Sequence, residues 1–260
     1  MACVVHEIET LAPAVTRAAL ILDLLAESAG RSLGPSEMSR RLGLPKSSIA
    51  NVCGALELAG LVRRIGTGFA LGRRLAELCG AYLATVDQVQ EFHEAAARLP
   101  AGSEETIQLA VLDGLDVIYL ARHDGRQEIR LTSAIGLRLA AFSTATGKVA
   151  LASLDDGELG RRLAGLTVLP RPTRRAHGTV AELLLDIDAI RRRGYAVDDE
   201  ETVEGVVCYA VLIPGRESGA PPGAASITLL KARASAERVP ALIDDLRQLA
   251  IELSDPLQRT

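Results

Sequence analysis

The chain has 260 residues, which predicts one or two domains because a domain commonly holds about 100–200 residues. Its residues are 48% hydrophobic and 24% charged, a globular composition that excludes general disorder. Aromatic residues make up only 3% and Trp is absent, which argues against modules that stack single-stranded bases on aromatic rings.

The cysteines and histidines are dispersed, with no CxxC pair and no metal-ligand spacing. No apolar run reaches the ~18 residues of a membrane span, and the N-terminus lacks the basic start of a secretory signal. We therefore expect a cytoplasmic protein with reduced thiols, no membrane association, no structural metal site and no cofactor.

The net charge of −4 is unevenly distributed along the chain. Residues 31–74 hold eight Arg and Lys residues and two Glu residues, so this window carries +6 and the remaining chain −10. A basic segment in an acidic protein indicates that one module contacts a polyanion while another has a different task.

Three helices are predicted near the N-terminus. Apolar residues at helical spacing predict the first helix over residues 14–29. Pro35 opens a short helix that runs to Leu42, and the Gly43-Leu44 turn leads to a third helix from Lys46 to about Ala59. Two short helices joined by a Gly-containing turn after a support helix form the helix-turn-helix pattern.

The third helix has small and polar residues on the side opposite its apolar positions, as a helix that enters the major groove requires. Residues 61–71 then predict two short strands around a glycine turn, a wing that carries Arg63 and Arg64. The predicted DNA-contacting residues are Arg40, Arg41, Lys46, Ser47, Ser48, Ala50, Asn51, Arg63 and Arg64. The alternative is a three-helix bundle with a solvated charged face.

A helical region without proline follows the wing. A near-heptad seam is formed by Leu75, Cys79, Tyr82, Val86, Val89, His93 and Ala96. A break near Thr85 divides the region into two helices. The seam either packs on its own domain or joins another subunit.

The C-terminal part mixes strands and helices without βαβ regularity, which predicts an α+β domain with an antiparallel sheet. Strands are predicted at residues 106–112, 116–122, 129–131, 206–213 and 225–230. Helices are predicted at about 145–154, after Asp155, from Thr179 to Gly194, and over 236–254.

Three motifs in this part invite a chemical interpretation. The Gly147-Lys148 pair is not a phosphate-binding loop, because Phe142 and Val149 replace the Gly and Ser or Thr of that motif. The acidic run 198–201 is a solvated loop, a metal site or a polar pocket wall, and the absence of an accompanying histidine weakens the metal interpretation. Cys208 is interpreted as a core residue, and a Cys/His hydrolase is disfavoured.

Several short motifs occur in a specific order along the chain. They are Gly43-Leu44-Pro45-Lys46-Ser47-Ser48, Gly60-Leu61-Val62, Leu71-Gly72, Thr146-Gly147-Lys148, Leu151-Ala152, Arg193-Gly194-Tyr195-Ala196, Asp198-Asp199-Glu200-Glu201, Gly205 and Cys208. In this order and spacing the chain resembles the IclR family of bacterial transcriptional regulators over nearly its whole length.

The resemblance implies a winged helix-turn-helix domain that binds double-stranded operator DNA, a linker helix, and a GAF-like α/β sensor domain with an antiparallel sheet. It implies dimers or dimers of dimers, and effectors that are small organic acids or aromatic catabolites. The effector pocket it implies is lined by Ala145, Thr146, Asp198, Cys208, Ser226 and Thr228. Ala145-Thr146 stands where some members have Gly-Ala, and Ala50-Asn51 replaces a larger polar pair, so neither the effector nor the operator is carried over.

We therefore predict a ligand-responsive transcription factor, not an enzyme. Its predicted domains are residues 1–72 for DNA binding, 73–100 for the linker and 101–260 for effector binding. The alternatives are a small-molecule enzyme with an accessory DNA-binding domain, which would need a nucleophile–base pair in the pocket, and a structural oligomerisation protein, which would have a filled C-terminal domain.

Overall fold

The computed structural model describes residues 12–28, 30–126, 134–215 and 221–254. It divides the chain into two units, residues 1–85 and 86–260, and this boundary falls inside the predicted linker region. The predicted strand at residues 129–131 and the last residue of the first predicted helix lie outside the described residues.

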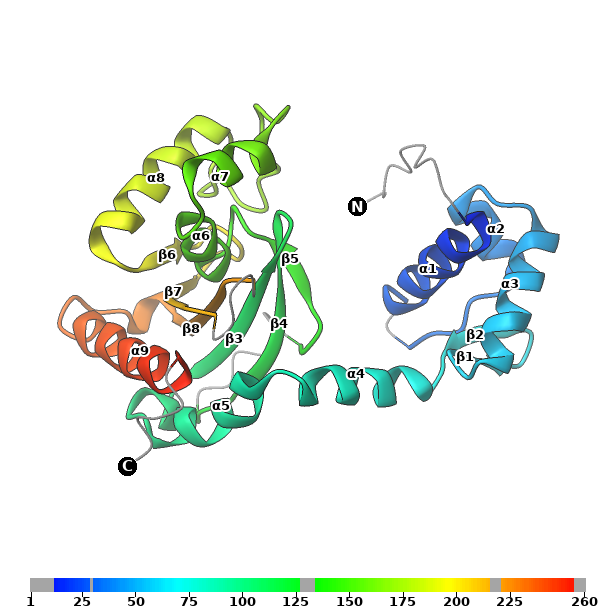
Figure 1. The fold of residues 1–260 in the computed structure, drawn as a ribbon, viewed down its shortest axis with the longest axis horizontal. Coiled ribbons are helices and arrows are strands. Elements are labelled where there is room, and N and C mark those ends of the chain that lie inside the picture. Colours follow the sequence, from blue (N-terminus) through cyan, green and yellow to red (C-terminus); the bar gives the residue numbers. More distant parts are fainter. Residues whose placement is uncertain (1–11, 29, 127–133, 216–220, 255–260) are drawn as a thin grey trace. The chain divides into compact units, whose positions relative to one another are not determined.

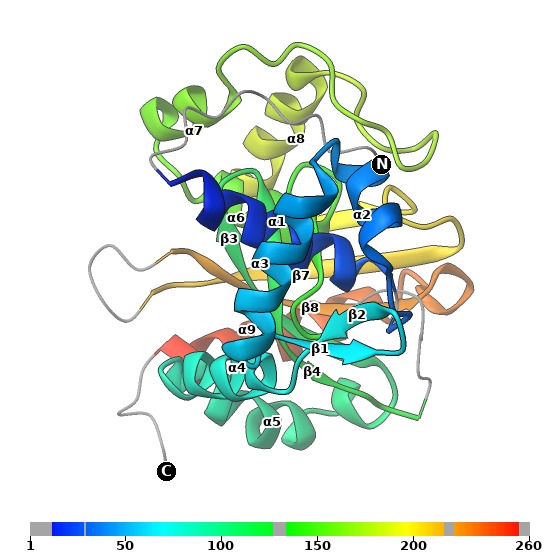
Figure 2. The ribbon, with the colours of Figure 1, turned by 90° about the vertical axis from the view of Figure 1, so that its right-hand side faces the viewer.

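The N-terminal unit is a three-helix bundle with a β-hairpin (Figures 1 and 2). The bundle and hairpin consist of α1 (Pro13–Ala26), α2 (Pro35–Leu42), α3 (Lys46–Leu58), β1 (Val62–Ile65) and β2 (Gly68–Leu71), and α4 (Arg74–Ala84) follows them in the same unit. Gly43 separates α2 from α3 with a left-handed φ of 67°, a conformation that glycine adopts without strain. Apolar residues from α1, α2, α3 and the hairpin share one core. The predicted helix-turn-helix and wing are therefore confirmed.

The C-terminal unit is built on a six-stranded antiparallel sheet with the strand order β5-β4-β3-β8-β7-β6. The strands are β3 (Thr106–Asp113), β4 (Asp116–His123), β5 (Arg138–Ala140), β6 (Ala196–Asp199), β7 (Val206–Ile213) and β8 (Gly223–Leu230). The sequence did not predict β5, and it placed the whole acidic run after a strand although Asp198 and Asp199 end β6.

Helices cover both faces of this sheet (Figure 1). They are α5 (Asp87–Arg98), α6 (Ala145–Ala152), α7 (Asp156–Leu163), α8 (Val180–Arg193) and α9 (Val239–Ser254), with short 3₁₀ turns η1 (Ala101–Ser103) and η2 (Lys231–Arg233). The α6–α8 side and the α5/α9 side bury alternate residues of each strand, as the period of a strand requires.

The predicted caps of α7 and α8 are confirmed. Asp155 Oδ1 accepts a hydrogen bond from Glu158 N at 2.8 Å. Thr179 and Glu182 form a reciprocal capping box at the start of α8, and Gly194 ends that helix in the left-handed conformation. These local side-chain signals set where α7 and α8 begin and where α8 ends.

The predicted heptad seam is wrong as a single continuous face. The chain breaks between Ala84 and Asp87, as expected, and α5 buries Val89 and Ala96 of the predicted seam together with Phe92 and Ala95, which lie outside it. Phe92 is fully buried and His93 is exposed, because α5 packs on the sheet of its own unit. In contrast, α4 buries none of its side chains in this chain.

Among the described residues, no helix is both long and apolar enough to cross a membrane. Cys53, Cys79 and Cys208 are free thiols. Burial raises the pKa of Cys53 to about 11, so this thiol is an inert core group of the N-terminal unit.

Candidate functional site

The exposed side of α3 consists of small and polar side chains. Lys46, Ser47, Ala50 and Asn51 are exposed, whereas Ile49 on the opposite side is fully buried. Small side chains allow a helix to approach base edges closely, and Asn51 offers both donors and an acceptor for such an edge. The structure thus places these four predicted residues on one accessible surface.

The two predicted wing arginines have different surroundings. The Arg64 guanidinium donates two hydrogen bonds to the Glu57 carboxylate, at 3.3 and 2.8 Å, and lies 4.5 Å from the centre of the Phe69 ring. These contacts tie the hairpin to α3 and neutralise the charge of Arg64. Arg63 is exposed, and within the described part of the chain its side chain donates to the Leu71 carbonyl oxygen alone, at 3.3 Å. Arg63 therefore remains the more available cation of the wing.

The remaining predicted residues also differ in their contacts. Arg41 pairs with Glu27 at 3.2 Å, and Arg40 is exposed. Ser48 is half-buried and its Oγ accepts a hydrogen bond from Arg17 Nη1 at 3.1 Å. Arg17 was not predicted, because α1 was interpreted only as a support helix. The contact fixes α1 against the start of α3.

A pocket in the C-terminal unit lies where the start of α6 meets the sheet. It is lined by Gln108, Tyr119, Leu139, Thr144, Ala145, Thr146, Asp198, Thr202, Val203, Val206, Cys208, Ser226 and Thr228. All six predicted effector residues therefore line one pocket. Because Ser226 pairs with Gln108 and Thr228 with Cys208, the register of β8 turns both hydroxyl residues toward the α6 side.

The start of α6 packs closely against the backbone of the residue that follows β5. A Cβ added to Gly147 would lie 2.2 Å from Ala141 Cα, so this position accepts only glycine. Thr144 Oγ1 caps the helix by accepting from Gly147 N at 3.1 Å. The Gly-Lys pair that was excluded as a phosphate loop thus has a packing role.

Asp198 supports the turn after β6. Its Oδ1 accepts hydrogen bonds from Glu201 N at 2.7 Å and from Thr202 N at 3.2 Å. Burial raises the pKa of Asp198 above its usual value, although these hydrogen bonds and the Lys148 charge act in the opposite direction. Asp198 is therefore a turn residue as well as part of the pocket wall.

We expect Asp198→Ala to lower the free energy of unfolding by about 1–3 kcal/mol, because two backbone N–H groups lose their acceptor. Asp198→Asn retains Oδ1 and removes the charge. Since the pKa is raised in the folded protein, ionisation of Asp198 lowers stability as the pH rises through that value. The Asn variant should therefore gain stability relative to the wild type as the pH rises above about 4, the usual pKa of an aspartate, in urea unfolding. A difference that stays constant as the pH rises would contradict the burial of an ionising carboxyl group.

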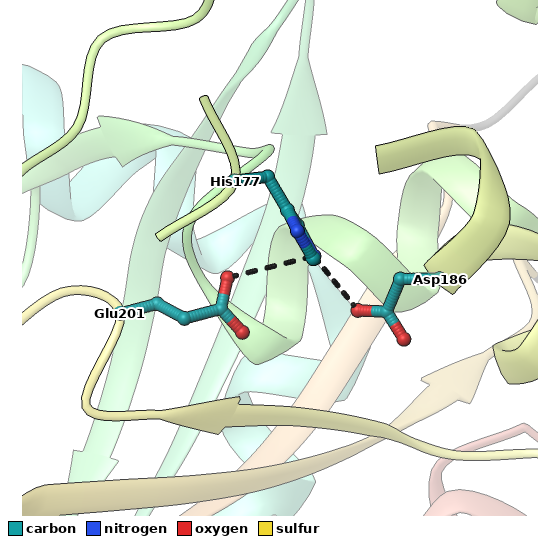
Figure 3. Close-up of side chains that lie close together, drawn as sticks. All are labelled: His177, Asp186 and Glu201. Carbon is teal, nitrogen blue, oxygen red and sulfur yellow. Dashed lines mark hydrogen bonds and ion pairs between the residues drawn. The ribbon is translucent and has the colours of Figure 1, made fainter. Parts of the chain in front are cut away.

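A buried ionic cluster adjoins the other end of the acidic run. Lys148 is 1% exposed, and its Nζ donates to Asp186 Oδ2 at 2.8 Å and to Glu201 Oε1. His177 Nε2 lies 3.2 Å from the same Asp186 oxygen and 3.9 Å from Glu201 Oε2 (Figure 3). Burial acts to raise the pKa of Asp186, but the His177 hydrogen bond and the Lys148 charge hold it well below its usual value.

This cluster corrects part of the sequence reasoning. The acidic run does have a histidine beside it in space, because the chain before α8 brings His177 to Glu201 (Figure 3). Ligand atoms of His177, Asp186 and Glu201 lie within 4.8 Å of one another, a spacing that a metal ion could bridge. The Lys148 ammonium bonds to both carboxylates and Arg193 lies 3.4 Å from Asp186 Oδ1, so two cations balance two carboxylates in an ion-pair network. His177 bonds to Asp186, so nothing here makes it a base for Cys208.

The comparisons with known proteins identify the chain. Residues 80–255 match the domain described as bacterial transcriptional regulator IclR, C-terminal, and residues 14–66 match the IclR helix-turn-helix domain. The chain belongs to the IclR family. The match covers both units, so this IclR-family protein is a ligand-responsive, DNA-binding transcriptional regulator whose C-terminal domain receives the effector.

Individual relatives agree with this assignment. The chain is 32% identical to the transcriptional regulator KdgR of Escherichia coli over 236 residues, which are 90% of this chain and 88% of KdgR. The repressor BlcR of Agobacterium tumefaciens is 32% identical with a TM-score of 0.59, over 94% of this chain and 96% of BlcR. An IclR homologue from Microbacterium hydrocarbonoxydans, complexed with 4-hydroxybenzoate, shares the fold at 22% identity with a TM-score of 0.71, over 91% and 98% of the two chains.

Proposed function

We propose that this IclR-family regulator senses a small carboxylate bound in the pocket at the start of α6. The observation that carries the proposal is the shared lining of Ala145, Thr146, Asp198, Cys208, Ser226 and Thr228. The first turn of a helix has backbone N–H groups without intrahelical acceptors and a partial positive charge, which favour an anion. Asp198 suits an effector hydroxyl, which could donate to it.

The chemistry of this lining suits an aromatic or aliphatic organic acid. Leu139, Val203 and Val206 supply apolar surface next to the hydroxyl side chains. The complex of the Microbacterium homologue with 4-hydroxybenzoate supports a hydroxyacid of this type as one probe. Thr146 adds a hydroxyl near the helix start, which favours a polar effector over a hydrocarbon.

The test is a thermal-shift and calorimetry panel of acetate, pyruvate, succinate and 4-hydroxybenzoate on the full-length protein. We expect at least one carboxylate to raise the unfolding temperature and to change the affinity for operator DNA, because the two sites are thermodynamically linked. The Asp198→Asn variant, which keeps the turn, should lose response to a hydroxyacid. Failure of every acid to bind the wild type would contradict carboxylate sensing.

We further propose that the protein acts as an even-numbered homo-oligomer on a roughly palindromic operator. One recognition helix reads only a few base pairs, and a two-fold assembly doubles the site. In α4, Leu78 is 48% and Tyr82 is 53% exposed, which leaves an apolar surface for a second copy. Light scattering should give twice or four times the subunit mass, and a monomer in the presence of operator DNA would contradict the proposal.

Within the N-terminal unit, we propose that base contacts come from Ser47, Ala50 and Asn51. Lys46, Arg40 and Arg63 would contact phosphates, because they are exposed and basic. For Arg41, Ser48 and Arg64, contacts within the protein favour a positioning role.

A further inference from the structure

The polar wall of the pocket contains one buried donor that the protein leaves without an acceptor. Gln108, on β3, is 2% exposed and its side chain lines the pocket. Its Nε2 has no hydrogen-bond partner among the residues that the structure describes. A donor buried in this way is costly, and a ligand that brings an acceptor removes the cost.

A directed chain of hydrogen bonds sets which end of the Gln108 amide is free. Thr228 Oγ1 donates its single proton to Gln108 Oε1 at 3.0 Å. Thr228 Oγ1 also lies 3.2 Å from Cys208 Sγ, and because its proton is already used it can only accept a hydrogen bond there. Burial, together with the nearby Asp198 charge, raises the pKa of the Cys208 thiol above its usual value, so the thiol keeps a proton that Thr228 Oγ1 can accept. Because Oε1 is used, the free end of the amide is a donor.

Other donors border the same space. Tyr119 Oη lies 3.3 Å from Thr146 Oγ1, and both residues line the pocket. Burial raises the pKa of the Tyr119 phenol above its usual value, so this group also remains protonated. Thr146 belongs to the first turn of α6, whose backbone N–H groups are oriented toward the helix start. This side of the pocket is therefore rich in donors.

We propose that Gln108 determines effector specificity: its Nε2 donates to a carboxylate oxygen of the effector, and the Cys208–Thr228 chain holds the amide in the orientation that allows this. The inference rests on the proposed function. In this proposal, the Gln108 amide and the backbone N–H groups at the start of α6 donate to the same carboxylate of the ligand. A primary amide in place of the carboxylate would present its own N–H groups to these donors, and its binding would be weaker.

The test compares each acid of the panel with its primary amide: acetamide, pyruvamide, succinamide and 4-hydroxybenzamide. Calorimetry on the full-length wild type should give tighter binding of the acid. The Gln108→Met variant has a similar side-chain length and no donor, so the best acid should bind about 10- to 100-fold more weakly. The acid-to-amide preference should shrink in the same variant.

Gln88→Met provides the matched control, because Gln88 lies on α5 and its Nε2 donates to the Pro214 carbonyl oxygen at 3.4 Å, away from the pocket lining. Its affinity for the acid should equal that of the wild type. If Gln108→Met does not fold, Gln108→Asn withdraws the amide from the pocket, and the same loss is expected.

The outcomes separate the two proposals. A wild type that binds none of the acids contradicts carboxylate sensing, and the role of Gln108 falls with it. A wild type that binds an acid while the Gln108 variants bind it equally tightly overturns the role of Gln108 alone. A wild-type preference for the amide would mean that the Gln108 side chain presents its oxygen to the ligand, which also overturns the inference.

Discussion

Replacement of Lys148 by Met is expected to lower the free energy of unfolding by about 3–5 kcal/mol, the usual cost of leaving buried charges without their partner. Lys148 Nζ bonds to Asp186 and Glu201, and Glu201 is itself buried. Met fills much of the space of the lysine chain but supplies no charge. Arg193, 3.4 Å from Asp186, then balances only one of the two carboxylates.

A matched control exists at the surface of the same unit. Lys231 also bonds to two carboxylates, those of Asp199 at 2.6 Å and Glu200 at 2.7 Å, but its side chain is 39% exposed. Lys231→Met should therefore cost only about 0–1 kcal/mol. Urea unfolding measures both variants. If the two losses are equal, the Lys148 cluster is not the buried ion-pair network described above.

For operator DNA, affinity is expected to fall by about 10³- to 10⁵-fold between about 50 and about 200 mM salt if about 6–10 phosphates are contacted. The basic residues of the N-terminal unit supply those contacts even though the whole chain carries −4. Electrophoretic or fluorescence titrations at several salt concentrations give the slope. A salt-independent affinity would contradict phosphate contact by this unit.

Single substitutions should separate the roles within this surface. Arg63→Ala should flatten the log–log slope by about 0.9, the loss of one phosphate contact. Arg64→Ala should instead lower the stability of the N-terminal unit, because Arg64 holds Glu57 and stacks on Phe69. Arg161→Ala, on α7 and 73% exposed, is the control and should leave the slope unchanged.

Base recognition should respond differently. Asn51→Ala is expected to change discrimination by about 1–3 kcal/mol at one base pair with little change in the salt slope. Binding to a set of single-position operator variants measures this effect. An equal loss on every operator variant would place Asn51 at the phosphate backbone instead.

The sequence predicted the elements whose signals are local. The capping box of Thr179 and Glu182 and the glycine turn at Gly43 were readable because each depends on residues within one turn. The three-residue strand β5 was missed, because so short a segment has no alternating pattern. The seam through His93 failed because packing on the sheet, not heptad spacing, selects the buried face of α5.

The pocket was only partly predictable. The resemblance to the family supplied the six residues that the fold brings together, but Gln108 and Tyr119 were not named. Both lie on the sheet face that also holds Ala110. Tyr119 pairs with Ala110 only because the register between β3 and β4 shifts after Leu109, and no local sequence pattern predicts that shift. The approach of His177 to Glu201 was likewise invisible, because it arises from tertiary packing of separate segments.

The exposure of α4 has a consequence for how the regulator assembles. Helices shorter than about 12–15 residues are marginal without tertiary packing, and α4 has 11 residues with none buried in its own chain. In the homo-oligomer proposed above, a second copy would supply the packing surface that this helix lacks. Coil-to-helix ordering of residues 74–84 and association of subunits would then be one equilibrium, so dilution would melt the segment that connects the DNA-binding unit to the sensor.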